Sequence, residues 1–280
     1  MSLDATNDDA LRGLATAYEK LNRPEDAEKT YQKAIDLRPQ YWASCAWLRS
    51  YYFRHARYDD AARIFSEWIA LTADSCQGYN NLGAVYLKQG RYGEAIPQFR
   101  RSVDINPGAD AFGNLATVFF YQGNFAEAAH QYKLAMEVGG EASDNYSLPG
   151  NLAEAYYWTP GNREQAKELY RQAISRAEKS LQVNSREGSV LSSLALYHAM
   201  LSDRQEANSY LQHALQLAPG DPEVRLNAAK IRKDSWRSSV DLPEAQASWL
   251  GPPAVGDFCP KNLVQQESTG GRYDSARGGE

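Results

Sequence analysis

The chain has 280 residues, of which 43% are hydrophobic, and its formal net charge is −5 at pH 7. This apolar fraction is enough to bury a core, so a wholly disordered chain is excluded. The mild acidity argues against a nucleic-acid-binding protein, which would carry a basic face, and it gives no support to a membrane partner.

Residues 1–7 are expected to form an N-terminal extension, and they lack the apolar stretch of a signal peptide. No uninterrupted apolar run reaches the roughly 20 residues that a membrane-spanning helix requires. The three cysteines, Cys45, Cys76 and Cys259, are far apart and outside any CxxC spacing. This usage favours free thiols in a reducing compartment, so we expect a cytoplasmic protein.

From residue 8 onward, a skeleton of large and small residues recurs at nearly fixed spacing. Each unit is typical of two short amphipathic helices with a tight turn between them, and a period near 34 residues indicates helix-pair repeats. Positions within a unit are numbered 1 to 34, with a small anchor residue at position 20. The anchors are Ala27, Ala61, Ala95, Ala128, Ala166 and Ala207.

The first two units cover residues 8–41 and 42–75. In the second unit, Arg49 replaces the small residue of position 8, and Trp68 replaces that of position 27. Small residues at these positions let helices approach closely. We therefore expect wider packing in the second unit, with Trp68 filling the gap.

The third unit, 76–108, is the most regular of the array, and the fourth covers 109–142. A polar loop follows, and the fifth unit, 146–187, is expected to have a second helix that runs about two turns beyond the usual end, to Val183. The sixth unit covers 188–221.

A half unit, residues 222–233, supplies a terminal helix. Arg225 and Arg232 occupy positions that full units bury, which suits an outer face in contact with water. Residues 234–280 are rich in Ser, Gly and Pro, so a largely disordered, flexible tail is expected. Its aromatic residues are explained by a short docking motif, by loose contact with the last helices, or by the altered end of a gene. These residues are Trp236, Trp249 and Phe258.

The third unit carries the pattern that resembles the tetratricopeptide-repeat family: Leu82, Gly83, Tyr86, Gly90, Ala95, Phe99 and Pro107. The resemblance extends over six full units and one half unit. It implies an all-α fold, a right-handed α-solenoid of antiparallel helix pairs whose first helices line a concave groove. It also implies a function, because members of the family bind peptides or protein surfaces and carry out no chemistry of their own.

The candidate binding residues lie at first-helix positions that face or border the groove. Position 6 holds asparagine in four units, and its amide can either hold an extended peptide backbone or bond a neighbouring helix. Positions 12 and 13 hold large apolar side chains, which either anchor a partner or pack between adjacent first helices. Lys88, with Arg12 and Arg54, adds positive charge near this face. The predicted groove residues are Asn81, Asn114, Asn151, Asn227, Phe53, Leu87, Lys88, Phe120, Tyr121, Tyr157 and Trp158.

No catalytic, cofactor or metal site is predicted. The four histidines show no metal spacing, and the sequence contains no GxxxxGK[ST], HExxH, GxSxG or GxGxxG. His198 occupies a core position and is expected to be buried or half-buried.

These patterns predict a non-catalytic scaffold that binds a protein or peptide segment in its concave groove. The alternative is the sensory or regulatory part of a bacterial signalling assembly whose kinase, cyclase or transcription-regulator domain is absent from this chain. Longer linkers around the fifth and sixth units are similar to those of bacterial arrays joined to such modules. The sequence leaves the oligomeric state open.

Overall fold

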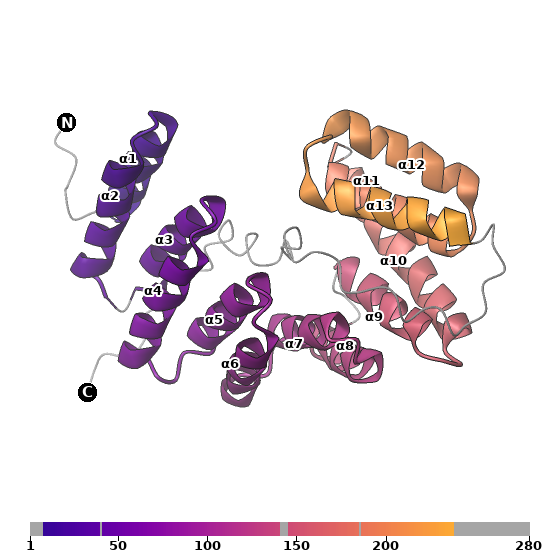
Figure 1. Cartoon of the computed structure of the whole chain (residues 1–280), viewed down its shortest axis with the longest axis horizontal. Coiled ribbons are helices and arrows are strands. Elements are labelled where there is room, and N and C mark those ends of the chain that lie inside the picture. Colours follow the sequence, from indigo (N-terminus) through magenta and orange to yellow (C-terminus); the bar gives the residue numbers. More distant parts are fainter. Residues whose placement is uncertain (1–7, 40, 141–144, 185, 238–280) are drawn as a thin grey trace, which may run out of the picture.

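The computed structural model describes residues 8–39, 41–140, 145–184 and 186–237. In these residues the chain forms thirteen α-helices and no strand, which confirms the predicted all-α solenoid. Successive helix pairs stack into an arch, so that the first pair and the last helices stand on opposite sides of an open middle (Figure 1).

The helices follow the predicted units closely. The six pairs are α1 (Asp8–Lys20) and α2 (Pro24–Leu37), α3 (Trp42–Arg54) and α4 (Tyr58–Leu71), α5 (Cys76–Lys88) and α6 (Tyr92–Ile105), α7 (Ala109–Tyr121) and α8 (Phe125–Gly139), α9 (Ser147–Trp158) and α10 (Arg163–Val183), and α11 (Gly188–Met200) and α12 (Arg204–Leu217). The terminal helix is α13 (Pro222–Arg237).

Each turn between the two helices of a pair contains one residue with positive φ. Glycine fills this place in the third, fourth and fifth units, as at Gly90 with φ of 71°. The other three units use Asn22, Ala56 and Ser202. A side chain makes the left-handed conformation unfavourable by roughly 1–2 kcal/mol, so these three turns are held by the packing of the helices they join.

Small residues at positions 8 and 20 let the helices of a pair touch. Ala15, Ala116, Ala153 and Ala195 at position 8 are fully buried, and every position-20 alanine is at most 2% exposed. The third unit has Gly83 at position 8, where a Cβ atom would lie 2.8 Å from the ring of Phe99. Large residues such as Phe99 fill the spaces between these contacts and make the core continuous.

The second unit packs more widely, as its sequence predicts, but Trp68 is accommodated by the next unit and was not predicted there. Arg49 is buried, and its guanidinium lies 5.6 Å from the ring of Phe53 and 5.9 Å from that of Phe65. α3 and α4 consequently pack less closely than the helices of the other full pairs. Trp68 is buried against α5, where a Cβ on Gly78 would come within 3.2 Å of its ring. The space for Trp68 is therefore provided by the next unit.

The last two units depart from the regular repeat. α10 has 21 residues, against 14 or 15 in the other second helices, and its end at Val183 confirms the predicted extension. Ala177, on this extension, packs against Val190 and Leu194 of α11.

The terminal helix was predicted to end at residue 233, but α13 continues to Arg237. The prediction was wrong because residues 234–237 contain neither glycine nor proline, so nothing in them stops a helix. Arg225 and Arg232 are exposed, as expected for an outer face. The predicted N-terminal extension, residues 1–7, and most of the predicted tail, residues 238–280 with Trp249 and Phe258, lie outside the described residues.

Candidate interaction surface

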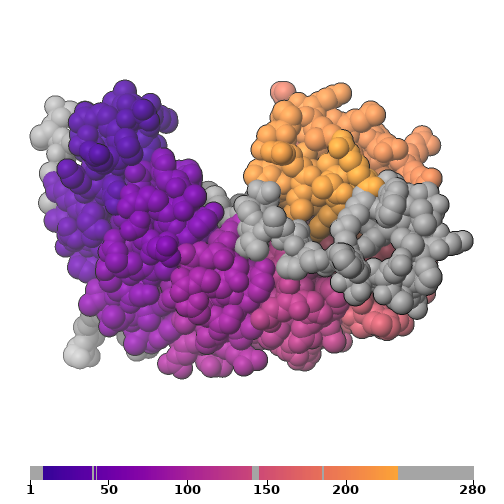
Figure 2. Space-filling model, in the orientation of Figure 1, coloured from indigo at the N-terminus to yellow at the C-terminus, as the bar shows by residue number. Residues whose placement is uncertain are grey.

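The arch encloses a hollow between its first and last units, which the space-filling view shows from one side (Figure 2). In Figure 1, α5 lies toward the inside of the arch and α6 on its outside. The predicted groove residues belong to first helices such as α5.

The position-6 asparagines differ in what their amides bond. Asn114 donates from Nδ2 to Oδ1 of Asn80 on α5, at 3.1 Å, in a buried contact. Asn227 donates in the same way to the hydroxyl of Ser192 on α11, at 3.0 Å. In both cases position 6 of one unit bonds position 5 of the preceding unit, so these two amides tie neighbouring first helices together.

For the other two position-6 asparagines, Asn81 and Asn151, the residue at position 5 of the preceding unit has no polar side chain. Position 5 of the preceding unit is Ala46 for Asn81 and Gly113 for Asn151. Asn81 is buried and accepts a hydrogen bond from Gln77 at 3.1 Å, whereas Asn151 is half-buried.

Aromatic side chains form a continuous row along the edge where first helices end and second helices begin. We call this set the aromatic row; it consists of Tyr92, Phe120, Tyr121, Phe125, Tyr157 and Trp158. Tyr92 stacks on Tyr121 with ring centroids 6.2 Å apart, and Phe120 meets Phe125 edge to face at 5.2 Å. Phe125 in turn stacks on Trp158 at 6.0 Å. The row thus runs through the third, fourth and fifth units, and each of its side chains is half-buried.

Four members of the row were predicted, and two were not. Tyr92 and Phe125 are the first residues of α6 and α8, and α4 likewise begins with an aromatic residue, Tyr58. This recurrence after the turn is the sequence signal that could have identified them. Burial raises the pKa of Tyr92, so its hydroxyl stays neutral beside Tyr121.

The remaining predicted apolar residues contribute to the core. Leu87 is 5% exposed and packs in the cluster that α5 shares with α7. Phe53 is half-buried and meets Tyr58 edge to face at 5.2 Å, within the second unit. Lys88 is half-buried in the last turn of α5.

The arginines near the groove are neutralised by carboxylates. Arg54 donates to both oxygens of Glu19, at 2.8 Å each, and Arg12 lies 3.2 Å from Asp9. Arg12 also lies over the ring of Trp47, 5.3 Å from its centroid. The positive charge expected here is therefore balanced locally.

The concave side is closed over the sixth unit. Every residue of α11 from Gly188 to Tyr197 is buried, because α9, α10, α12 and α13 surround this helix. Gly150 of α9 makes part of this possible, since a Cβ there would lie 2.3 Å from the hydroxyl of Tyr197. Lys230 of α13 reaches past α11 to Glu154 of α9, with Nζ 2.8 Å from Oε1.

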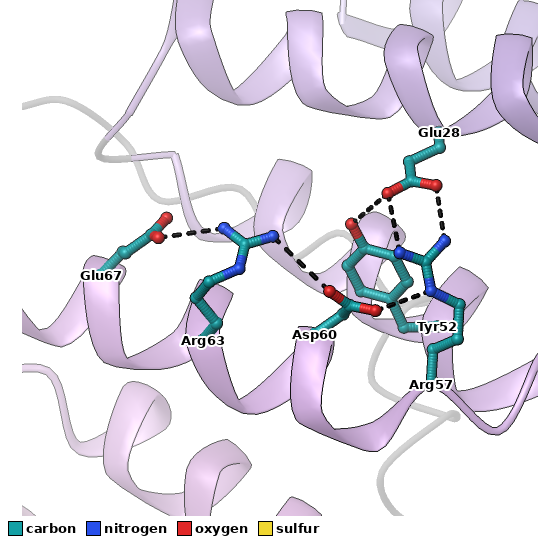
Figure 3. A network of polar contacts seen from close by, with 6 residues as sticks. All are labelled: Glu28, Tyr52, Arg57, Asp60, Arg63 and Glu67. Atoms are coloured by element: carbon teal, nitrogen blue, oxygen red, sulfur yellow. Dashed lines mark hydrogen bonds and ion pairs between the residues drawn. The ribbon is translucent and has the colours of Figure 1, made fainter.

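The junction of the first two units is polar, and it is drawn in Figure 3. Glu28 of α2 accepts hydrogen bonds from the hydroxyl of Tyr52 at 2.8 Å and from Arg57 at 2.6 Å. Arg57 also donates to Asp60, which lies 3.8 Å from Arg63. Arg63 in turn donates to Glu67 at 3.0 Å.

The ionisation of this junction follows from its contacts. Burial opposes the charge of Glu28, but the hydrogen bonds from Arg57 and Tyr52 outweigh burial, and the pKa of Glu28 is lowered. The pKa of Tyr52 is raised by burial and by its bond to Glu28. The network therefore holds a charged pair and a neutral phenol at neutral pH.

Among the residues that the structure describes, no group of three His, Cys, Asp or Glu side chains converges so that it could hold a metal ion. In the same residues, no helix combines the length and apolar character needed to cross a bilayer. His198 is half-buried as predicted, with Nδ1 3.1 Å from Asp203 and its ring stacked on Tyr210.

Models of the tetratricopeptide repeat match three segments of the chain: residues 9–41, 74–139 and 150–180. The chain belongs to the tetratricopeptide-repeat family. The matched segments leave out residues 42–73, in which Arg49 and Trp68 replace small residues of the repeat. No curated protein matches the sequence significantly.

Several solved structures share the fold of this tetratricopeptide-repeat protein. One chain of the APC/C hetero-tetramer Cut9–Hcn1 aligns with a TM-score of 0.57 at 15% identity, over 81% of this chain and 43% of that chain. This chain therefore spans less than half of that protein's length. The Pseudomonas aeruginosa pilF structure aligns with a TM-score of 0.53 at 20% identity, over 80% of this chain and 97% of that one. A MamA structure gives 0.50 at 18% identity, over 63% and 95%. At these identities the likeness concerns the fold alone.

Proposed function

We propose that this tetratricopeptide-repeat protein is a non-catalytic cytoplasmic scaffold that binds an extended segment or a helix of another protein. The segment docks on the concave side of the third to fifth units, over α5, α7 and α9. The repeats themselves support a protein-interaction role in general. The docking site over α5, α7 and α9 is proposed in addition.

The proposed docking site on the third to fifth units rests on a single observation, the aromatic row. Half-buried aromatic rings offer large apolar area at little loss of side-chain entropy, and such residues dominate the energetics of interfaces. Phe120 and Trp158 project from consecutive units, so a bound segment could contact both. The α11 surface offers no comparable site, because its residues from Gly188 to Tyr197 are buried.

The charges near the groove favour an apolar mode of recognition. Arg54 and Arg12 are paired with carboxylates, so a partner gains little from an acidic group there. Asn151 is the position-6 amide best placed to bond a peptide backbone, because it is half-buried and the neighbouring position 5 is Gly113.

A peptide selection tests the proposal. Peptides that bind the full chain are selected from a random displayed library, and their affinities are measured by fluorescence anisotropy. Trp158→Ala is expected to weaken binding at least tenfold, or about 1.4 kcal/mol. Tyr41→Ala, which removes an exposed aromatic residue outside the row, is the control and should leave affinity unchanged.

The competing location is the tail. Removal of residues 238–280 should leave the affinity of the selected peptides unchanged. Peptides that bind Trp158→Ala as well as the unmodified chain, or that require the tail, would contradict the proposed groove.

A further inference from the structure

The outer face of α1 is exposed where every other first helix is covered. Position 7 is Leu14 in the first unit, with 42% of its surface exposed. The equivalent residues of later units are at most 6% exposed; they are Leu48, Leu82, Leu115, Leu152, Leu194 and Ala228. A preceding unit covers position 7 in each of those cases.

The exposed face is a regular apolar stripe. Ala10, Leu14, Ala17 and Leu21 follow one another at intervals of four, three and four residues, which is the spacing of a coiled-coil seam. Leu21 is 67% exposed, and Ala17 is also exposed. Beside the stripe, a Cβ added to Gly13 would meet nothing within 4 Å, so another helix could approach closely.

The opposite end of the array has a different surface. α13 presents Arg225 and Arg232 to solvent, which is unsuited to covering an apolar stripe. Head-to-tail stacking of one copy on the next is therefore disfavoured. Residues 1–7 contain one branched apolar side chain, Leu3, while the stripe extends over about 16 Å, from Ala10 to Leu21 in the turn that follows α1.

We propose that the α1 stripe binds the same stripe of a second copy, with the two helices antiparallel about a two-fold axis. Such an interface is self-complementary, because each copy contributes the same residues in reverse order. Antiparallel pairing sets Leu14 of one copy against Ala17 of the other, so large residues meet small ones along the seam.

Charge specifies the antiparallel arrangement. By helical spacing, Asp9 and Lys20 lie on the same flank of the stripe, at opposite ends of α1. In an antiparallel pair, the two copies set this flank on the same side of the seam, so Asp9 of each copy lies near Lys20 of the other. In a parallel pair the two flanks would lie on opposite sides of the seam, and these charges would not meet. Both side chains are exposed, and Asp9 also contacts Arg12 within its own helix.

Sedimentation velocity of the full chain at increasing concentration tests the proposal. A single helix pair buries less than a standard interface, so a reversible dimer with a micromolar dissociation constant is expected. Leu14→Glu should weaken dimerisation at least tenfold. Val183→Glu, at an apolar residue of α10 that is 91% exposed, is the matched control and should not weaken it. Circular dichroism checks that each variant remains helical.

A charge exchange tests the orientation. Asp9→Lys and Lys20→Asp should each weaken the dimer, and the double variant should restore it, because the exchanged charges again face each other. The proposal is overturned if the chain stays monomeric at every concentration, or if Leu14→Glu dimerises as well as the unmodified chain. It is also overturned if the chain forms ever larger oligomers as concentration rises instead of stopping at a dimer. Dimerisation that appears only after removal of residues 1–7 would also overturn it, since those residues would then cover the stripe.

Discussion

The two ends of the array join their units by different means. The first and second units meet through charged and polar side chains, centred on Glu28, Tyr52 and Arg57. The fifth unit, the sixth unit and the terminal helix α13 meet mainly through close apolar packing, in which Gly150 admits the ring of Tyr197 and the greater part of α11 is buried. The aromatic row lies between these regions.

This difference shows that one repeat pattern can be stabilised by two kinds of contact. A polar junction tolerates changes of volume but depends on the ionisation of its members. A close-packed junction is insensitive to pH and sensitive to any added atom. Substitutions at matched positions in the two regions should separate these two kinds of contact.

Substitutions at position 8 should lower stability by different amounts in the two regions. Ala195→Arg in the sixth unit adds a large charged side chain at a fully buried site and should destabilise the fold by about 4 kcal/mol or more. Arg49→Ala in the second unit should cost only about 1–3 kcal/mol, from lost packing on Phe53 and Phe65. Urea denaturation measures the free energy of unfolding of both variants. Equal losses of stability would contradict the contrast between the two regions.

Position 5 gives a matched pair of glycines. Gly150→Ala forces a methyl group into the space of the Tyr197 ring and should lower stability by about 1–3 kcal/mol. Gly113→Ala meets only a methyl of Leu148 at 3.5 Å, so the better helix propensity should raise stability by about 0.5–1 kcal/mol. If Gly150→Ala stabilised the protein as well, the proposed contact with Tyr197 would be wrong.

The polar junction should depend on pH. The folded-state pKa of Glu28 lies below the ordinary value of 4.5 for a glutamate, so its contribution is present above the unfolded-state pKa and is lost as pH falls through the folded-state pKa. Glu28→Gln should therefore lower stability by about 1 kcal/mol at pH 7, since it weakens a charge-assisted bond that is partly exposed.

The same comparison at acid pH supplies the check. Thermal unfolding of both proteins is followed from pH 7 down to pH 3, and their difference should shrink below pH 4.5. A difference that stays constant with pH would assign the effect of Glu28→Gln to packing.

The ion pair of α13 should have the smallest effect. Lys230 and Glu154 are 21% and 20% exposed, so Lys230→Met should destabilise α13 by about 1 kcal/mol. Lys167→Met removes a more exposed ion pair, with Glu164, and should leave stability unchanged, because solvent screens this pair. The effect of Lys230→Met is measured by the hydrogen-exchange rates of the α13 amides. Unchanged rates would mean that Lys230 does not hold α13 in place.

The sequence predicted the fold because helix packing in a repeat depends on residue size at a few fixed positions. Ala95, Gly83 and Phe99 reveal their roles by spacing alone, and the long α10 followed from the continued apolar period. Trp68 stands out in the sequence as an exception at position 27, but its contact with Gly78 could not be predicted, because the repeat pattern does not show which neighbouring residue leaves space for its ring.

The site was less accessible to sequence reasoning than the fold. Repetition identified Asn114 as a first-helix amide, but its bond to Asn80 depends on a polar residue at position 5 of the preceding unit. Tyr92 and Phe125 join the aromatic row from second helices, which lay outside the positions considered. Closure over the sixth unit depends on Gly150 and Lys230, two residues that are distant in sequence from the surface they cover.

Photo-crosslinking shows directly which surface of the chain a bound peptide contacts. A selected peptide with a photoreactive group at its centre is irradiated with the full chain, and the attached residues are mapped by mass spectrometry. If the peptide docks in the proposed groove, adducts are expected on the aromatic row and the adjoining surfaces of α7 and α9. Adducts concentrated on α12, α13 or the outer faces of second helices would show that the partner binds elsewhere.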